Sequence, residues 1–368
     1  MGELKTEELI LNMGPHHPST HGVLRLLLKL DGENVKELEP VIGYLHRGTE
    51  KLAEDLNYTQ IIPYTDRMDY LAAMLSNYNL VHCVETALGL EIPERAEYIR
   101  VIVMELQRIA SHLVSWGTFL MDLGATTPFL VAFRDRETIL EFFSELSGAR
   151  LTYNYMRVGG VKWDVPPGWV ERVGEFVQYM KKEVAGYHQL VTGNEIFLQR
   201  TVGVGKYTAE QAVNYGLTGV TLRCTGVNWD LRKDEPYSIY DRFEFDVPTS
   251  TDGDCYARYE LRLKEVEESL RILEQAVAQF PKEGEFMAKV PRVIRPPAGE
   301  CYTRIESSKG ELGTYIYSEG KDKPYRLKFR RPSFVNLAIL PEITVGESMA
   351  NVVAILGSID IVLGEVDA

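Results

Sequence analysis

The stretch from Tyr256 to Phe280 carries the clearest helical spacing in the chain, and it constrains the fold more than any other segment. Its apolar positions step by three and four residues until Pro281 ends the run: Leu263, Val266, Leu270, Leu273, Val277 and Phe280. A second long stretch, from Ile99 past Trp116, repeats this spacing. Because such helices must bury their apolar stripes against neighbours, they predict an antiparallel helical bundle. A single heptad helix favours a seam inside that bundle over a dimer zipper.

Other helices are expected along the chain. Thr65 can serve as the N-cap of a helix that ends near Gly89, which would place Arg67, Asp69 and Tyr70 in its first turn. The remaining predicted helices run from Gly43 into the fifties, from Pro93 past Trp116, over Phe129–Leu146, from Trp169 to about Leu190, over Ser333–Leu340 and over Val352–Leu363.

Strand patterns lie on both sides of these helices. Val23–Leu30 and Val35–Leu38 predict a hairpin around an Asp-Gly turn, and three further strands are expected at Tyr302–Ile305, Leu312–Tyr317 and Tyr325–Phe329. The predicted fold class is therefore α+β, with a mainly helical core bundle, an N-terminal β-hairpin region and a small C-terminal β region. We expect one integrated domain with three parts: residues 1–60 with the hairpin, 61–295 with the helical core, and 296–368 with the C-terminal β/α segment.

Composition excludes several classes of function. The chain is 45% hydrophobic, enough for a sizeable core, and its net charge of −13 argues against a nucleic-acid partner. No secretory signal and no uncharged apolar run of membrane-spanning length is visible, so we expect a cytoplasmic protein that does not cross a membrane. The four cysteines stand singly, without a Cys-x-x-Cys pair, and a free buried thiol is expected for each: Cys83, Cys224, Cys255 and Cys301.

The segment from Met13 to Gly22 holds three of the seven histidines in the chain. Its two prolines and two glycines predict a stiff loop that leads into a strand. His17 and His21 have the spacing of a helical zinc-binding pair, but Pro18 and the absence of a following glutamate disfavour that site. The alternative from turn chemistry is that these residues only cap the start of the strand.

Asp122 is the other polar residue that the sequence leaves unexplained. It lies between apolar neighbours, where burying a carboxylate costs free energy unless the group has a partner. A histidine could be that partner. His112, which lies on the long helix after Pro93, is instead expected to be a packing histidine and not a ligand.

Seven motifs together make the chain resemble a known family. They are Met-Gly-Pro-His-His-Pro-Ser-Thr-His-Gly, Gly-Tyr-Leu-His-Arg-Gly-Thr-Glu-Lys, Tyr-Thr-Asp-Arg-Met-Asp-Tyr-Leu, Glu-Leu-Gln-Arg-Ile-Ala-Ser-His-Leu, Phe-Arg-Asp-Arg-Glu, Gly-Glu-Leu-Gly and the closing Gly-Ser-Ile-Asp-Ile-Val-Leu-Gly-Glu-Val-Asp-Ala. In this order they resemble the D subunits of bacterial respiratory complex I, the NADH:quinone oxidoreductase. The resemblance runs from Gly14 to the last residues.

That family is related to the large subunits of nickel–iron hydrogenases, which hold their metal with two Cys-x-x-Cys pairs. The matching segments here, from Arg67 to Ala72 and within Ser358–Asp367, contain no cysteine. Because soft thiolates hold such a metal, the hydrogenase activity is excluded and no metal site is expected. Without the metal, what the resemblance implies is the cavity that held it, and in the family this cavity receives a quinone headgroup.

The resemblance also implies roles for individual residues. His21 and Tyr70 would donate hydrogen bonds to the two carbonyl oxygens of the quinone, and Asp122 would hold His21. The cavity loop would consist of His17, Ser19, Thr20 and Gly22, with His16 in its wall. Arg67 and Arg47 would lie near the terminal [4Fe–4S] cluster of the neighbouring B subunit.

The expected partners are the B and C subunits, the H subunit of the membrane arm and the quinone, and the chain itself would bind no cofactor. The expected location is peripheral, on the cytoplasmic face of the cell membrane. Thr152 stands where many family members carry a histidine, which suggests a low-potential quinone such as menaquinone. Two alternatives remain open: the same quinone site in a complex driven by ferredoxin or a deazaflavin, and a non-catalytic scaffold that packs an electron-transfer subunit.

Overall fold

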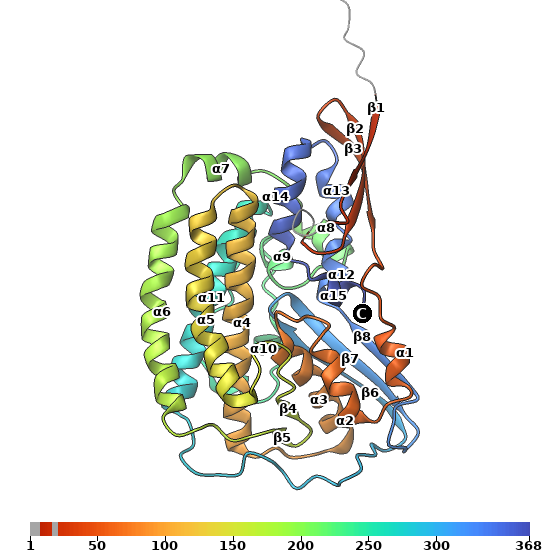
Figure 1. Cartoon of the computed structure of the whole chain (residues 1–368), viewed down its shortest axis with the longest axis vertical. Coiled ribbons are helices and arrows are strands. Elements are labelled where there is room, and N and C mark those ends of the chain that lie inside the picture. Colours follow the sequence, from red (N-terminus) through yellow and green to blue (C-terminus); the bar gives the residue numbers. More distant parts are fainter. Residues whose placement is uncertain (1–7, 17–20) are drawn as a thin grey trace, which may run out of the picture.

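The computed structural model describes residues 8–16 and 21–368. Its largest part is a bundle of long, roughly antiparallel helices, seen on the left of Figure 1. These helices are α4 (Glu94–Asp122), α5 (Thr126–Ser147), α6 (Trp169–Val191) and α11 (Cys255–Ala278). Helix α11 packs against α4 and α6, so the predicted heptad is confirmed as a bundle seam.

Helix α4 is the centre of this bundle. Between Arg95 and Leu120 every residue except Glu97 and Thr118 is buried, as expected for a helix that is covered on all sides. Its His112 is buried, and Nε2 lies 3.0 Å from Oε2 of Glu265 on α11. The prediction that His112 is a packing residue is confirmed by this contact.

The N-terminal region forms a three-stranded antiparallel sheet at the upper right of Figure 1. The predicted hairpin is confirmed as β2 (Arg25–Asp31) and β3 (Asn34–Val41). Alternate residues of β2 are buried, which fixes one face of the strand to the core. The sequence prediction missed the edge strand β1 (Glu8–Met13), which pairs with β2.

The C-terminal region contains a second three-stranded antiparallel sheet, and its three predicted strands are confirmed with longer bounds. They are β6 (Gly299–Ser307), β7 (Gly310–Ser318) and β8 (Arg326–Arg330). Helix α3 (Ala73–Leu88) packs against β6 and β7. The tight turn between β6 and β7 carries Lys309 into the interior.

The predicted helix start at Thr65 is wrong. Thr65 ends a separate helix, α2 (Tyr58–Thr65), which contains Pro63, and α3 begins only at Ala73. The predicted end of α3 at Gly89 is confirmed. Residues 66–72 therefore form a loop, and Arg67, Asp69 and Tyr70 lie on it and not in a helical turn. Similarly, the helix predicted from Gly43 is reduced to α1 (Thr49–Ala53).

The two predicted C-terminal helices have other bounds in the structure: the helix predicted over Ser333–Leu340 ends at Leu337. The helix predicted over Val352–Leu363 begins at Met349 and ends at Ile359, before a bend at Asp360. This residue has a left-handed φ of 62°, which ends one helix and lets another start. The helices of this region are α12 (Pro332–Leu337), α13 (Leu340–Thr344), α14 (Met349–Ile359) and α15 (Leu363–Val366).

The remaining elements are short connections. They are β4 (Met156–Arg157), β5 (Gly160–Val161), α7 (Glu195–Thr201), α8 (Ala209–Asn214), α9 (Val220–Arg223), α10 (Leu231–Asp234) and the 3-10 turn η1 (Tyr240–Arg242). Within the described ranges, none of the helices has both the length and the apolar character that crossing a membrane requires.

Candidate functional site

His21 and Asp122 form a close pair between the N-terminal region and the end of α4. Nε2 of His21 lies 2.5 Å from Oδ2 of Asp122, with 15% and 12% of the two side chains exposed. Asp122 is the last residue of α4, where a carboxylate among apolar neighbours needs such a partner. The contact fixes one ring nitrogen of His21 and leaves the other for a different partner.

The backbone at His21 adopts a conformation that few residues favour. Its φ is 55°, and the φ of Gly22 is 136°. A Cβ on Gly22 would lie 3.0 Å from Cδ1 of Leu363, so only glycine allows this approach without strain. Strained positions of this kind concentrate at functional sites. The other predicted loop residues His17, Ser19 and Thr20 lie outside the described residues.

Tyr70 is positioned by a buried ion pair next to it. Nζ of Lys309 lies 3.1 Å from Oδ2 of Asp69, and Oδ1 of Asp69 accepts a hydrogen bond from the backbone N–H of Leu71 at 3.1 Å. These contacts fix the loop on both sides of Tyr70. Burial and the negative charge of Asp69 raise the pKa of Tyr70, so its phenol keeps the proton at neutral pH.

Helix α14 closes the site behind the histidine pair. A Cβ added to Gly357 would lie 3.2 Å from Nε2 of His21 and 3.2 Å from Oδ2 of Asp122. Any side chain at this position would press against both polar atoms. The glycine therefore allows α14 to cover the pair closely.

Helix α15 brings the tyrosine loop and the histidine loop together. A Cβ on Gly364 would lie 3.4 Å from Cε1 of Tyr70 and 2.7 Å from the backbone oxygen of Met68. The preceding residue, Leu363, is the one that contacts Gly22. The loops that carry His21 and Tyr70 thus pack against consecutive residues of α15, although they are far apart in the sequence.

A cavity of about 450 Å³ opens beside Tyr70. Nη2 of Arg47 donates a hydrogen bond to the backbone oxygen of Arg67 at 2.6 Å, and Nη1 of Arg67 donates to that of Pro63 at 2.7 Å. The cavity thus brings two phenols and two guanidinium groups into one lining, at a size typical of small-molecule sites. Its lining residues are Tyr44, Leu45, His46, Arg47, Arg67, Tyr70, Leu151, Thr152 and Gly364.

Asp367 holds the loop that leads to Arg47. Its carboxylate accepts hydrogen bonds from the backbone N–H groups of Gly43 and Leu45, each at 2.8 Å. Its backbone oxygen lies 2.8 Å from Nδ1 of His46. Sequence reasoning missed Asp367 and His46 as parts of the site, because nothing local links two segments at opposite ends of the chain.

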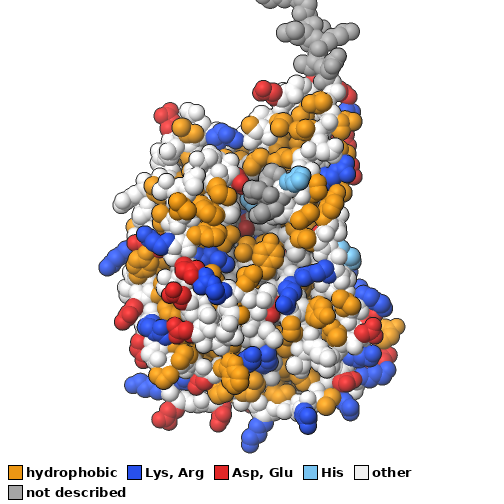
Figure 2. All heavy atoms as spheres, viewed as in Figure 1, with side chains coloured by type: hydrophobic (Ala, Val, Ile, Leu, Met, Phe, Trp, Pro, Cys, Tyr) orange, Lys and Arg blue, Asp and Glu red, His pale blue; other side chains and the backbone are white. Residues whose placement is uncertain are grey.

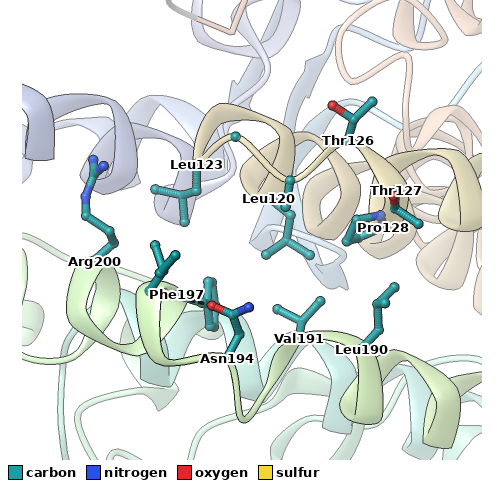
Figure 3. A pocket seen from close by; sticks show the side chains of 13 residues that line it. Leu120, Leu123, Thr126, Thr127, Pro128, Leu190, Val191, Asn194, Phe197 and Arg200 are labelled. Carbon is teal, nitrogen blue, oxygen red and sulfur yellow. Dashed lines mark hydrogen bonds between the residues drawn. The ribbon is translucent and has the colours of Figure 1, made fainter.

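A second cavity, of about 530 Å³, lies where the turn after α4 faces the turn after α6. In Figure 3 the side chains of Leu120 and Val191 point toward one another across it, with Phe197 beside them. Arg200 is the one ionisable side chain among the described residues that line it. This lining offers apolar contact but no pair of groups for proton transfer.

The cysteines do not contribute to either cavity. Cys83, Cys224 and Cys255 are buried free thiols, as predicted, whereas the prediction of burial is wrong for Cys301, which is partly exposed on β6. In the part of the chain that the structure describes, no group of three His, Cys, Asp or Glu side chains is arranged to hold a metal ion.

Comparison with known proteins gives one consistent result. Residues 122–368 match the family described as "Respiratory-chain NADH dehydrogenase, 49 Kd subunit". The chain is 69% identical over 364 residues to the D subunit of the NADH-quinone oxidoreductase of Geobacillus kaustophilus (strain HTA426), covering 99% of each chain. It is 68% identical to the D subunit from Geobacillus thermodenitrificans (strain NG80-2) and 67% identical to that from Bacillus anthracis, covering 99% of this chain and 100% of each relative.

The matches to the three relatives span both sides of the site, since they include the loop with His21 and the C-terminal helices. The α+β fold, with its helical bundle and two small sheets, agrees with them. The chain therefore belongs to the family of NADH-quinone oxidoreductase D subunits, which are parts of a multisubunit oxidoreductase complex.

Proposed function

We propose that this chain forms the quinone headgroup site of its complex. The observation that carries the proposal is that the loops bearing His21 and Tyr70, two side chains able to carry a proton, pack against consecutive residues of α15. Family membership supports it, since the names of the relatives include quinone. A scaffold protein would have no need for a partly desolvated histidine–carboxylate pair whose loop packs beside the loop of a tyrosine.

The headgroup would be held at its two carbonyl oxygens. Tyr70 keeps its proton at neutral pH and can donate to one oxygen. His21 can donate to the other oxygen from Nδ1 when its ring is doubly protonated, because the contact with Asp122 occupies only Nε2. Reduction of a quinone to a quinol needs two electrons and two protons, and the proposed roles of Tyr70 and of the His21–Asp122 pair are to supply the protons.

The electrons would come from outside this chain. A [4Fe–4S] cluster in the neighbouring B subunit would supply them one at a time. Arg47 and Arg67, which line the cavity beside Tyr70, would lie near that cluster and favour its reduced form by their positive charge. Thr152 also lines the cavity and cannot titrate, which fits a low-potential quinone such as menaquinone.

The surface suggests how the chain would be oriented in the complex. On the face shown in Figure 2, hydrophobic side chains gather over the upper half, whereas charged side chains ring the lower half. Exposed apolar residues on β1, α5 and α7 belong to that end: Leu9, Ile10, Leu130 and Ile196. We place this end toward the H subunit of the membrane arm, with the B and C subunits on other faces, so that the chain is peripheral on the cytoplasmic side.

Coupling to proton translocation would begin at the same site. Loss of protons from Tyr70 and from the His21–Asp122 pair leaves negative charge in a partly desolvated region. In our hypothesis, this charge and a movement of the histidine loop start the response of the membrane subunits.

Photoaffinity labelling with an azido-quinone tests the proposal. Label is expected in peptides that contain Tyr70 or the segment around His21, and excess unmodified quinone should prevent it. Label confined to other subunits would support the scaffold alternative. Co-purification with a flavin-bearing NADH module would separate an NADH-driven complex from one driven by ferredoxin or a deazaflavin.

A further inference from the structure

Four ionisable side chains gather beside Tyr70 in a part of the interior that the proposed chemistry does not use. They come from four separate elements: the loop 66–72, the β6–β7 turn, the end of α14 and α15. Asp69, Lys309 and Glu365 are buried, and the side chain of Asp360 is 9% exposed. Such a cluster is costly to bury unless its charges balance. The members of this cluster, which we call the Lys309 cluster, are Asp69, Lys309, Asp360 and Glu365.

The cations near the cluster leave one carboxyl group without a partner. Nζ of Lys309 lies 3.1 Å from Oδ2 of Asp69 and 3.9 Å from Oδ2 of Asp360. Nε of Arg262, on α11, lies 3.8 Å from the same oxygen of Asp360. Two cations thus face three carboxyl groups. Lys309 pairs with Asp69 and Arg262 with Asp360, which leaves Glu365.

Glu365 has the surroundings of a carboxyl group that holds a proton. It is fully buried, and its Oε2 accepts a hydrogen bond from the backbone N–H of Ser333 at 3.0 Å. Its Oε1 has no hydrogen-bond partner among the described residues. Arg331, the residue before α12, contacts the backbone oxygen of Glu365 at 3.4 Å and not its carboxylate. Burial, and next the charge of Asp69, raise the pKa of Glu365 to about 7.

The other polar groups of the cluster do not take over this role. From α4, the hydroxyl of Ser111 lies 3.0 Å from Nζ of Lys309, and the neighbouring His112 is paired with Glu265. From the loop 66–72, Asp69 connects the cluster to Tyr70, the next residue in the chain. Buried carboxyl groups that serve only structure are normally hydrogen-bonded at both oxygens, which Glu365 is not.

We propose that Glu365 stores a proton that restores Tyr70 after this phenol has protonated the reduced quinone; the inference rests on the function proposed above. The O–H bond of Tyr70 breaks as an O–H bond forms on the quinol, which leaves a tyrosinate. The carboxyl O–H bond of Glu365 then breaks, and the proton passes through the carboxylate of Asp69 to the tyrosinate oxygen. No electrons move in this second step.

Lys309 stabilises the cluster both when Glu365 is protonated and when it is ionised. Before the transfer it neutralises Asp69, and after the transfer its positive charge also faces the new carboxylate of Glu365. Reprotonation of Glu365 from solvent completes the cycle. Glu365 is thus a positioning and supply residue that acts through Tyr70 and does not touch the quinone.

Glu365→Gln in the assembled complex tests the inference. The amide keeps the size and the acceptor for Ser333 but cannot release a proton. The amount of assembled complex is measured by NADH oxidation with an artificial electron acceptor. Quinone turnover per complex should fall about tenfold, and its pH dependence between about pH 6 and pH 8 should disappear. The KM for quinone should not change. The matched control is Glu319→Gln, which removes a carboxylate that is 40% exposed and paired with Lys321, and it should behave as the parent.

Glu365→Asp is the second variant, since it retains a carboxyl group. It should assemble, keep part of the turnover and keep a pH-dependent profile, shifted from that of the parent. An equal loss at every pH in Glu365→Gln and Glu365→Asp would indicate a structural role and overturn the inference. If Glu365→Gln does not assemble, a parental profile in Glu365→Asp overturns it.

Tyr70→Phe separates the failure of this inference from the failure of the proposed function. Parental turnover and pH profile in Glu365→Gln, together with lost turnover in Tyr70→Phe, would overturn the proton store alone. Full turnover in Tyr70→Phe would overturn the proposed function and the store that depends on it.

Discussion

Gly364 lies directly against the ring of Tyr70, so close that a Cβ on this glycine would be 3.4 Å from Cε1 of the tyrosine. The same Cβ would be 2.7 Å from the backbone oxygen of Met68, a distance that forces a shift. The position of α15 thus determines where the phenol of Tyr70 can lie. This relationship leads to a prediction that does not change any polar group.

Gly364→Ala is expected to displace the loop with Tyr70 and to lower quinone turnover about tenfold or more, because small misplacements of reacting groups are costly. Turnover per assembled complex measures the effect. Gly186→Ala, on the exposed face of α6 where nothing lies within 4 Å of the new Cβ, is the matched control. It should leave turnover unchanged. Equal turnover in both variants would show that the contact does not position Tyr70.

Asp66 is expected to make the free energy of unfolding of this chain depend on pH. It is fully buried and accepts hydrogen bonds from the backbone N–H of Asn154 at 3.1 and 3.3 Å. Burial raises the pKa of Asp66 to about 7. The folded state therefore keeps a proton that the unfolded chain loses near pH ~4, so stability falls as the pH rises from about 4 to about 7.

Asp66→Asn should flatten this part of the stability curve, since the amide cannot ionise but can still accept a hydrogen bond. In the parent, the free energy of unfolding decreases as the pH rises. In the variant, this decrease should be smaller by up to about 1.4 kcal/mol per pH unit. Urea unfolding of the purified chain at several pH values provides the measurement. The prediction fails if variant and parent show the same slope.

Glu265 holds two buried side chains of the bundle. Its Oε1 accepts hydrogen bonds from Nε and Nη2 of Arg223 at 3.0 and 2.5 Å, and Oε2 lies 3.0 Å from His112. Glu265→Ala would leave Nε and Nη2 of Arg223 and Nε2 of His112 without this acceptor in the core, whereas Nη1 of Arg223 keeps Glu306 at 2.7 Å. The expected loss of unfolding free energy is about 1–3 kcal/mol for each side chain left without its partner. Thermal or urea unfolding measures it. Glu267→Ala on the same helix, where the side chain is 52% exposed, should change stability by less than ~1 kcal/mol.

Most of the fold could be predicted from local pattern. The heptad of α11, the apolar repeat of α4 and the Asp-Gly turn between β2 and β3 depend on residues close together in the chain. The loop 66–72 could not be predicted in this way. It is held by Lys309 and by Gln107, whose Nε2 donates to the backbone oxygen of Leu71 at 2.6 Å, and both partners come from distant segments.

The candidate site could be predicted only in part, for the same reason. The unexplained carboxylate at Asp122 was a signal in the sequence, and the resemblance to a family named His21 as its partner. Lys309 gave no such signal, because a lysine in a Gly-containing hairpin turn is normally exposed. Its burial follows from contacts with Asp69 and Asp360, which the sequence pattern does not show.

Quinone turnover in His21→Ala and Tyr70→Phe shows whether these two side chains supply the protons for quinone reduction. Each variant is measured in the assembled complex, which is counted by its NADH oxidation with an artificial acceptor. Each substitution is expected to lower quinone turnover about a hundredfold or more and to leave the artificial-acceptor activity unchanged. Parental quinone turnover in both variants would contradict it.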